Sequence, residues 1–257
     1  MDIGIALPTM CRGSAAAVTE RVRIFANLSV VPAHPVALVA KQAATLDVLS
    51  EGRFTLGVGV GGRDGDYRSL AAGTERRHDR LDRAVAELRS LWAGEPPFTG
   101  ADPVGPPCVQ PGGPPVLAGA LGPKSLARAA RWADGVVAFS VGGVPGEIAW
   151  SADTARRAWA DADRDVPRLV SGCFYALGVP DTRTVLGDFT AEYLNFLGSG
   201  NAAAAAAAMK THNTDALHRT LDAAEAAGLD EFILVPAAAD RAVLHATLEV
   251  IAVRGTG

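Results

Sequence analysis

Short apolar runs alternate with longer amphipathic stretches along the chain, and this alternation predicts its secondary structure. The apolar runs indicate seven strands, at Ile3–Leu7, Val22–Val31, Arg53–Val60, Pro115–Gly119, Gly135–Val141, Arg168–Leu177 and Glu231–Pro236. Apolar residues at helical spacing predict helices at Pro35–Leu49, Arg77–Trp92, Pro123–Ala133, Gly146–Ala162, Leu186–Phe196, Ala202–Met209, Asp215–Ala227 and Arg241–Val253. Elements that alternate in this order are typical of a parallel α/β fold.

The natural closed form of such a series is a (β/α)8 barrel, in which eight parallel strands form the wall. The pattern contains seven strands, and the gap falls near the start of the chain. There, Met10–Ala17 leaves almost no room for a parallel crossover, which needs a dozen residues or more. Ala15–Arg21 is interpreted as the tail of a helix. We expect either an open barrel or residues omitted from the sequence, and we favour the omission because two unpaired edge strands are costly.

Composition and charge narrow the class of protein. The 257 residues suit one barrel domain over residues 1–257, and 49% apolar with 20% charged residues is ordinary for a globular chain. A net charge of −4 offers no basic excess for nucleic acid. No apolar run is long enough to cross a membrane, and the Met1-Asp2 start does not resemble a secretion signal. Cys11, Cys108 and Cys173 are too few and too far apart for a disulfide framework, so we expect a cytoplasmic protein.

Three glycine-containing strand ends are candidate ligand sites, because parallel barrels build their sites there. Gly57–Gly62 lacks the helix and acidic partner of a dinucleotide fingerprint, so it indicates either a ligand or a tight corner. In Ala118–Ser125, Pro123 is placed to begin a helix whose first amides, with Lys124, suit a phosphate. Ala138–Gly143 carries a serine that suits either a ligand or a turn.

The chain shows no recognisable acid–base or metal constellation. It has no nucleophile elbow, no P-loop and no histidine pair at metal-binding spacing. His34, just past the second predicted strand, is the one histidine placed near the mouth of the fold, where a structural role is as reasonable as a chemical one. We therefore expect an organic cofactor to carry the reaction, and we assign no catalytic residue and no metal.

Two segments carry a resemblance to a known family. Pro35–Asp47 followed by Leu49–Gly62 resembles the bacterial luciferase-like monooxygenase family, and more narrowly its actinobacterial branch that depends on coenzyme F420, the deazaflavin. Ala127–Gly135 and Gly228–Pro236 fit the same family, and the resemblance covers most of residues 22–253. It implies an eight-stranded barrel that binds FMN or the deazaflavin at its C-terminal mouth.

The resemblance also implies cofactor-binding residues. Ser29 and Val30 match a strand end that touches the cofactor ring, and in several relatives the peptide bond between these two positions is cis. Gly59 and Gly61 match a strand end beside the ring. The remaining matches form the phosphate loop and the residue after the next strand: Gly119, Leu121, Gly122 and Ser140.

The departures from the family pattern limit what is carried over. Relatives typically have a first helix, a second strand and a loop where this chain has only Cys11–Ser14, and in several of them that loop provides the histidine or acid near the reactive ring. Gly62 stands where some deazaflavin dehydrogenases have a catalytic glutamate, which argues against sugar-phosphate dehydrogenase chemistry.

The leading hypothesis is an F420-dependent oxidoreductase that transfers a hydride between the deazaflavin and a small organic substrate. An FMN-dependent monooxygenase that uses oxygen and a reductase partner is the alternative, and a cofactor-binding paralogue without turnover is a third. Arg63, Arg68, Arg76 and Arg77 indicate either a contact with the polyglutamate tail of F420 or a solvated helix start. The resemblance implies a homodimer. The loops at residues 94–115 and 182–201 are expected to choose the substrate.

Overall fold

The computed structural model describes residues 1–6 and 12–254, with the backbone alone for residues 12–14. The chain divides into two compact units, and each is described by itself. The N-terminal unit consists of Pro8–Ala120 and Ala127–Val136. The C-terminal unit consists of Met1–Leu7, Leu121–Leu126 and Val137–Gly257.

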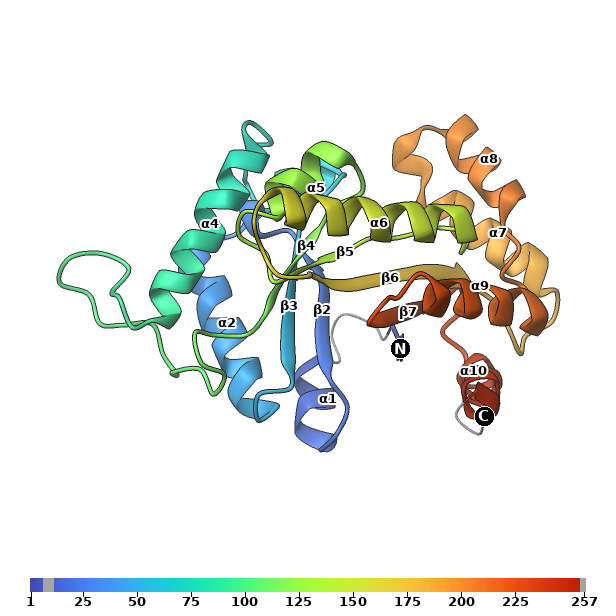
Figure 1. Ribbon diagram of the computed structural model, residues 1–257, viewed down its shortest axis with the longest axis horizontal. Helices are drawn as coiled ribbons and strands as arrows, with labels where there is room; N and C mark the ends of the chain where they lie inside the picture. The colour runs from blue at the N-terminus through green and yellow to red at the C-terminus, as the bar shows by residue number, and fades with distance from the viewer. Residues whose placement is uncertain (7–11, 255–257) are drawn as a thin grey trace. The chain divides into compact units, whose positions relative to one another are not determined.

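The N-terminal unit contains three neighbouring parallel strands together with the helices that precede or follow them in the chain (Figure 1). Its strands are β2 (Ile24–Ser29), β3 (Phe54–Val58) and β4 (Val116–Gly119). Its helices are α1 (Arg12–Val18), the 3-10 helix η2 (Val31–Ala33), α2 (Val36–Leu49), α3 (Asp64–Ser69) and α4 (Arg77–Trp92). Ile24 pairs with Phe54, and the register of β2 against β3 shifts between Ala26 and Ser29.

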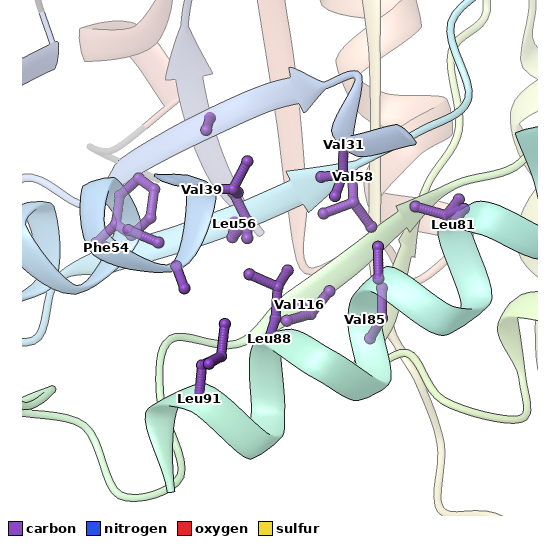
Figure 2. Close-up of a cluster of buried hydrophobic side chains, with 14 of the residues drawn as sticks. Val31, Val39, Phe54, Leu56, Val58, Leu81, Val85, Leu88, Leu91 and Val116 are labelled. Carbon is purple, nitrogen blue, oxygen red and sulfur yellow. The ribbon is translucent and has the colours of Figure 1, made fainter. Parts of the chain in front are cut away.

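The hydrophobic core of this unit lies between α4 and the strands. The sequence predicts one apolar face on α4, and that face is confirmed: all four of its residues, Leu81, Val85, Leu88 and Leu91, are buried. Figure 2 shows this row of side chains turned toward Leu56, Val58 and Val116 of the strands. The prediction for α2 is confirmed in part, because Val39 and Ala43 are buried whereas Leu49 is exposed. Burial of each large aliphatic side chain contributes about 1.5–3 kcal/mol.

A buried carboxylate holds the long Pro- and Gly-rich segment after α4. Asp47, fully buried in α2, accepts hydrogen bonds from the Val109 amide (2.7 Å), the Gln110 amide (3.0 Å) and Gln110 Nε2 (2.7 Å). Gln110 Nε2 also donates to the carbonyl of Phe54 at 2.8 Å. The segment contains no helix or strand, as its composition predicts. Side-chain hydrogen bonds therefore supply the partners that a regular element would provide for its backbone.

The C-terminal unit contains the remaining strands and the larger helices. Its strands are β1 (Asp2–Ile5), β6 (Arg168–Tyr175) and β7 (Glu231–Pro236), with the short β5 (Gly135–Val137) divided between the units. The helices are α5 (Pro123–Ala129), also divided, α6 (Pro145–Asp161), α7 (Thr182–Tyr193), the 3-10 helix η3 (Asn195–Leu197), α8 (Ser199–Ala208), α9 (Thr214–Ala226) and α10 (Arg241–Arg254). Glu231 of β7 lies in register with Asp2 on one side and with Val170 on the other.

All seven predicted strands form, and they make one sheet in the order β1-β7-β6-β5-β4-β3-β2. The expectation of an eight-stranded barrel wall is not met, because no eighth strand occurs in the described residues and β1 and β2 stand at the ends of the sheet. Between β1 and β2, the seven-residue α1 is the only regular element in the described residues, and a further strand with its crossover helix needs about 30 residues. The fold is therefore α/β with a seven-stranded parallel sheet. The omission of residues from this stretch stays a hypothesis, and Leu7, Met10 and Cys11 lie outside the described residues.

No helix in the described part of the chain is long and apolar enough to span a membrane.

Candidate functional site

The ends of β2, β3 and β4 bring together five of the eight predicted cofactor-binding residues. Ser29 ends β2 and Val30 follows it, Gly59 and Gly61 follow β3, and Gly119 ends β4. The amide of Gly59 donates to the carbonyl of Ser29 at 2.9 Å, which joins two of these strand ends directly. The pattern of strands thus places these residues on one edge of the N-terminal unit, as parallel pairing requires.

Leu28 gives the glycines of this edge a local structural reason. A Cβ atom on Gly119 would lie 2.3 Å from Leu28 Cδ1, and one on Gly59 would lie 3.2 Å from the same atom. A Cβ on Gly57 would lie 2.8 Å from Leu28 Cδ2 and 2.6 Å from the Ala26 carbonyl oxygen. The Leu28 side chain therefore lies across three glycines and remains 37% exposed. The glycine spacing left this strand end open between a ligand site and a tight corner, and no motif in the sequence marks the leucine that covers it.

The cis peptide bond lies two residues before its expected position. The resemblance implies a cis bond between Ser29 and Val30, whereas the structure has it between Asn27 and Leu28. This position falls inside the register shift of β2, between Ala26 and Ser29. The irregular part of β2 is therefore centred on Leu28, the residue whose side chain covers the glycines.

Tyr67 and Arg80 fix the segment after β3. Tyr67 is buried in α3, and its hydroxyl donates to the Val60 carbonyl at 2.6 Å. Burial raises the pKa of the Tyr67 hydroxyl, against the smaller opposing effect of Arg77 and Arg80, so the hydroxyl keeps the proton that it donates. Arg80 donates to the carbonyls of Pro32 and Gly73, and its guanidinium lies 5.9 Å from the centre of the Tyr67 ring. No motif in the sequence marks this pair, because Tyr67 is the single large apolar residue of α3.

The other three predicted residues lie in the C-terminal unit, and two of them already have intramolecular hydrogen bonds. Leu121 is 65% exposed, and the space beside Gly122 is open. The Gly122 amide donates to Ser125 Oγ at 3.1 Å at the start of α5, a helix of only seven residues. Ser140 is buried; its hydroxyl donates to Glu147 Oε2 at 2.6 Å and accepts from the Val144 amide at 2.8 Å. Cofactor binding by these residues stays a prediction, and the Ser140 hydroxyl is used in joining its loop to α6.

The described residues contain no group of three or more metal-binding side chains. Their two cysteines are also unsuited to nucleophilic catalysis. Burial, with a smaller effect of Asp47, raises the pKa of the Cys108 thiol to about 11, and burial raises that of Cys173 to about 12. Both thiols are therefore protonated at neutral pH, and a thiolate is the reactive form. His34 follows η2, and its amide donates to the carbonyl of Val31 at 3.0 Å.

The strand ends, rather than a set of acid–base side chains, define the class: a parallel α/β protein whose candidate site is made of glycines and aliphatic residues. A family model described as luciferase-like monooxygenase matches residues 6–243, and the chain belongs to that family.

Curated relatives share parts of the chain. An uncharacterised protein of Mycobacterium tuberculosis is 35% identical over 136 residues, which is 50% of this chain and 48% of that protein. The F420-dependent hydroxymycolic acid dehydrogenase of the same organism is 38% identical over 119 residues, 41% of this chain and 31% of the enzyme. Pyrimidine monooxygenase RutA of Escherichia coli is 32% identical over 166 residues, 60% of this chain and 46% of the enzyme. The matches thus span less than half the length of these relatives.

Solved structures share the fold over nearly the whole chain. The coenzyme F420-dependent tetrahydromethanopterin reductase of Methanopyrus kandleri has a TM-score of 0.72 at 15% identity and covers 98% of this chain, with 91% of that protein covered. The monooxygenase RslO1 of Streptomyces bottropensis has a TM-score of 0.70 at 19% identity, with 98% of this chain and 87% of that protein covered. At these identities the likeness establishes the fold alone.

Proposed function

We propose that this protein is an F420-dependent oxidoreductase that transfers a hydride between the deazaflavin and a small organic substrate. The observation that carries the proposal is the apolar strand-end surface of Leu28 over Gly59 and Gly119, in a family of redox enzymes. A flat ring can pack against the exposed aliphatic side chain of Leu28, which the glycines allow to lie close to the strand ends. The similarity to the F420-dependent hydroxymycolic acid dehydrogenase supports F420 as the cofactor.

The residues of the N-terminal unit suit contact with the cofactor ring. Leu28, partly exposed, offers an aliphatic face, and Ser29 and Val30 continue along the same strand end. Gly61 has a φ of +65°, and a Cβ there would lie 3.0 Å from Val30 Cγ1, so glycine keeps this turn compact. The cofactor would supply the hydride, while these residues orient the ring and exclude water from it.

The phosphate of the cofactor is assigned to the segment Gly119–Gly122, in agreement with the resemblance. Leu121 is exposed and the space at Gly122 is open, so the backbone there is accessible. The positive charge of Lys124 supports the same assignment. The Ser140 hydroxyl already donates a hydrogen bond to Glu147, so Ser140 would contribute to cofactor binding by holding the following loop in place.

The acidic tail of F420 is assigned to the arginines after β3. Arg76 already forms an ion pair with Asp79, at 3.2 Å. Arg68 is exposed on α3 and Arg77 is partly exposed at the start of α4, so these two suit an anionic chain better than Arg76 does.

An FMN-dependent monooxygenase is the second candidate, and the similarity to pyrimidine monooxygenase RutA supports it. This activity would require oxygen and a reductase partner. A homodimer and a cytoplasmic location remain proposals that rest on the family resemblance.

Titration of the purified protein with F420 and, separately, with FMN tests these proposals by quenching of its tryptophan fluorescence. We expect F420 to bind at micromolar concentration or tighter, and FMN to bind more weakly. Gly119→Val should weaken F420 binding because its side chain must displace Leu28, whereas Gly65→Ala, in open space on α3, is the control. Preference for FMN would favour the monooxygenase. Binding of neither would refute both activities, and binding without turnover would favour a non-catalytic paralogue.

A further inference from the structure

The C-terminal unit contains a pocket whose walls carry four basic side chains. The pocket has a volume of about 250 Å³ and is formed by the start of α7, the end of α8, the segment between α8 and α9, and the first two turns of α9. Its basic side chains are Arg183, Lys210, His212 and Arg219. Among the described residues that line it, none is acidic.

Arg183, Lys210 and Arg219 form no ion pair with a carboxylate in the described part of the chain. No side-chain hydrogen bond involves these three residues there either. The neighbouring Asp181 caps α7, and hydrogen bonds from Thr184 lower the pKa of its carboxyl, with a smaller contribution from Arg183. Other arginines do pair with carboxylates: Arg76, Arg89, Arg128, Arg156, Arg168 and Arg254. The chain has 28 acidic residues and 24 lysines and arginines, so a shortage of acidic residues does not explain why none of them lines the pocket.

Hydrogen bonds fix the walls of the pocket before any ligand binds. Thr182 Oγ1 donates to the His212 carbonyl at 2.7 Å, which joins α7 to the segment before α9. Thr211 Oγ1 donates to the Phe174 carbonyl at 2.6 Å, and the Ala176 amide donates to the Thr211 carbonyl at 3.1 Å. The pocket is thereby attached to the carboxyl end of β6, the end at which parallel barrels carry their ligands. A site that is already ordered loses less conformational freedom on binding.

The start of α9 adds to the positive potential. Asn213 caps this 13-residue helix, with its Oδ1 atom accepting from the Ala216 amide at 2.9 Å, and both residues line the pocket. The helix dipole therefore has its positive end at the pocket. It supports the binding of an anion that the unpaired arginines and lysine would hold.

We propose that this pocket binds the oxyanion group of a small molecule that carries at least two negative charges, such as a phosphate ester or a polycarboxylate. Arg183 and Arg219 donate to the oxygen atoms through their planar guanidinium groups, and Lys210 adds a third positive charge. If the function proposed above is correct, the anionic group belongs to the substrate, because the acidic tail of F420 is assigned to the arginines after β3; occupation of the pocket by that tail is the other outcome of the competition test below.

Isothermal titration calorimetry of the full chain with inorganic pyrophosphate, and separately with citrate, tests the proposal. We expect saturable binding at one site, and a loss of about tenfold or more in affinity for Arg183→Gln and for Arg219→Gln. Arg241→Gln is the matched control, because it removes the same charge from an exposed position of α10 outside the pocket. It should change the affinity by less than about twofold, since distant exposed charges are screened by salt. Absence of saturable binding, or an equal loss in the control, would overturn the proposal.

Competition identifies the source of the anion. If F420 with a long glutamate tail displaces pyrophosphate and F420 without the tail does not, the pocket serves the cofactor; if neither displaces it, the pocket serves the substrate. Pyrophosphate binding in a protein that does not respond to F420 would support the pocket while refuting the proposed function. F420 binding without any pyrophosphate or citrate binding would refute the pocket alone.

Discussion

Replacement of Asp47 by alanine should destabilise the N-terminal unit by about 2–4 kcal/mol. The buried carboxylate accepts three hydrogen bonds of 2.7–3.0 Å from Val109 and Gln110. Hydrogen bonds to a charged group contribute about 1.5–3 kcal/mol each, and buried donors without a partner cost about 1–3 kcal/mol. The full sum is an upper bound, because Val109 is exposed and water can reach part of the freed backbone.

Asp47→Asn separates geometry from hydrogen bonding. The amide keeps the size of the side chain, and its oxygen still accepts from the backbone amides of Val109 and Gln110. Its NH2 group, however, faces Gln110 Nε2, which also donates to the Phe54 carbonyl. We therefore expect an intermediate loss of about 1–2 kcal/mol.

Urea unfolding followed by circular dichroism measures these free energies, and tryptophan fluorescence reports the loop directly. The indole of Trp92 lies against Gly113, where a Cβ atom would be 2.3 Å from the ring, and its Nε1 atom donates to the Ala40 carbonyl. Release of the loop should therefore change the emission of Trp92 at low urea. Glu87→Ala, at an exposed position of α4, is the control and should stay within about 0.5 kcal/mol of wild type. If Asp47→Ala also stayed within that range, the structural role of the carboxylate would be wrong.

Three further predictions concern the candidate site and the thiols. Gly119→Ala should force Leu28 to move and cost about 1–3 kcal/mol of stability by urea unfolding; unchanged stability and F420 affinity would contradict the contact. Tyr67→Phe removes a hydrogen bond and should cost about 0.5–1.5 kcal/mol, with faster hydrogen exchange at residues 60–72 as the sign that the segment after β3 has loosened. Cys108 and Cys173 should resist alkylation in the folded protein at pH 8 and react after unfolding. Rapid labelling at pH 8 would show that the thiols are less protected than the structure indicates. Their folded-state pKa values, about 11 and 12, exceed the reference value of 9.0. The stability that the protonated thiols contribute is therefore present below pH 9 and is lost as the pH rises toward 11 and 12.

Periodicity predicted the elements that bury a regular apolar face. The row from Leu81 to Leu91 repeats at helical spacing, and all seven strands are short apolar runs bounded by glycine or proline. α3 was missed because its sequence, Asp64–Ser69, has one buried residue and no repeating pattern. Leu49 was assigned to a buried face but is exposed, since it is the last residue of α2 and directly precedes the turn.

Parts of the candidate site depend on contacts that spacing cannot reveal. Leu28 covers glycines that lie about 30 and 90 positions later in the chain, so no local motif marks it. The basic pocket brings Arg183 and Arg219 together through the three-dimensional course of α7 and α9, so no local spacing in the sequence marks it. The hydrogen bond between Ser140 and Glu147 was likewise not predicted, because the sequence around Glu147 is that of an ordinary helix start.

The pairing of β1 with β7 has a consequence for synthesis of the chain. Asp2 and Glu231 are partners in the sheet although they lie 229 positions apart, so the first strand emerges from the ribosome long before its neighbour exists. At about 5–20 residues per second, the wait lasts about 10–50 s. During that time the N-terminal unit, whose strands β2, β3 and β4 are complete by Gly119, has every partner that those strands use among themselves. We therefore expect a nascent chain to acquire protease resistance first in that unit, with the β1 segment protected last.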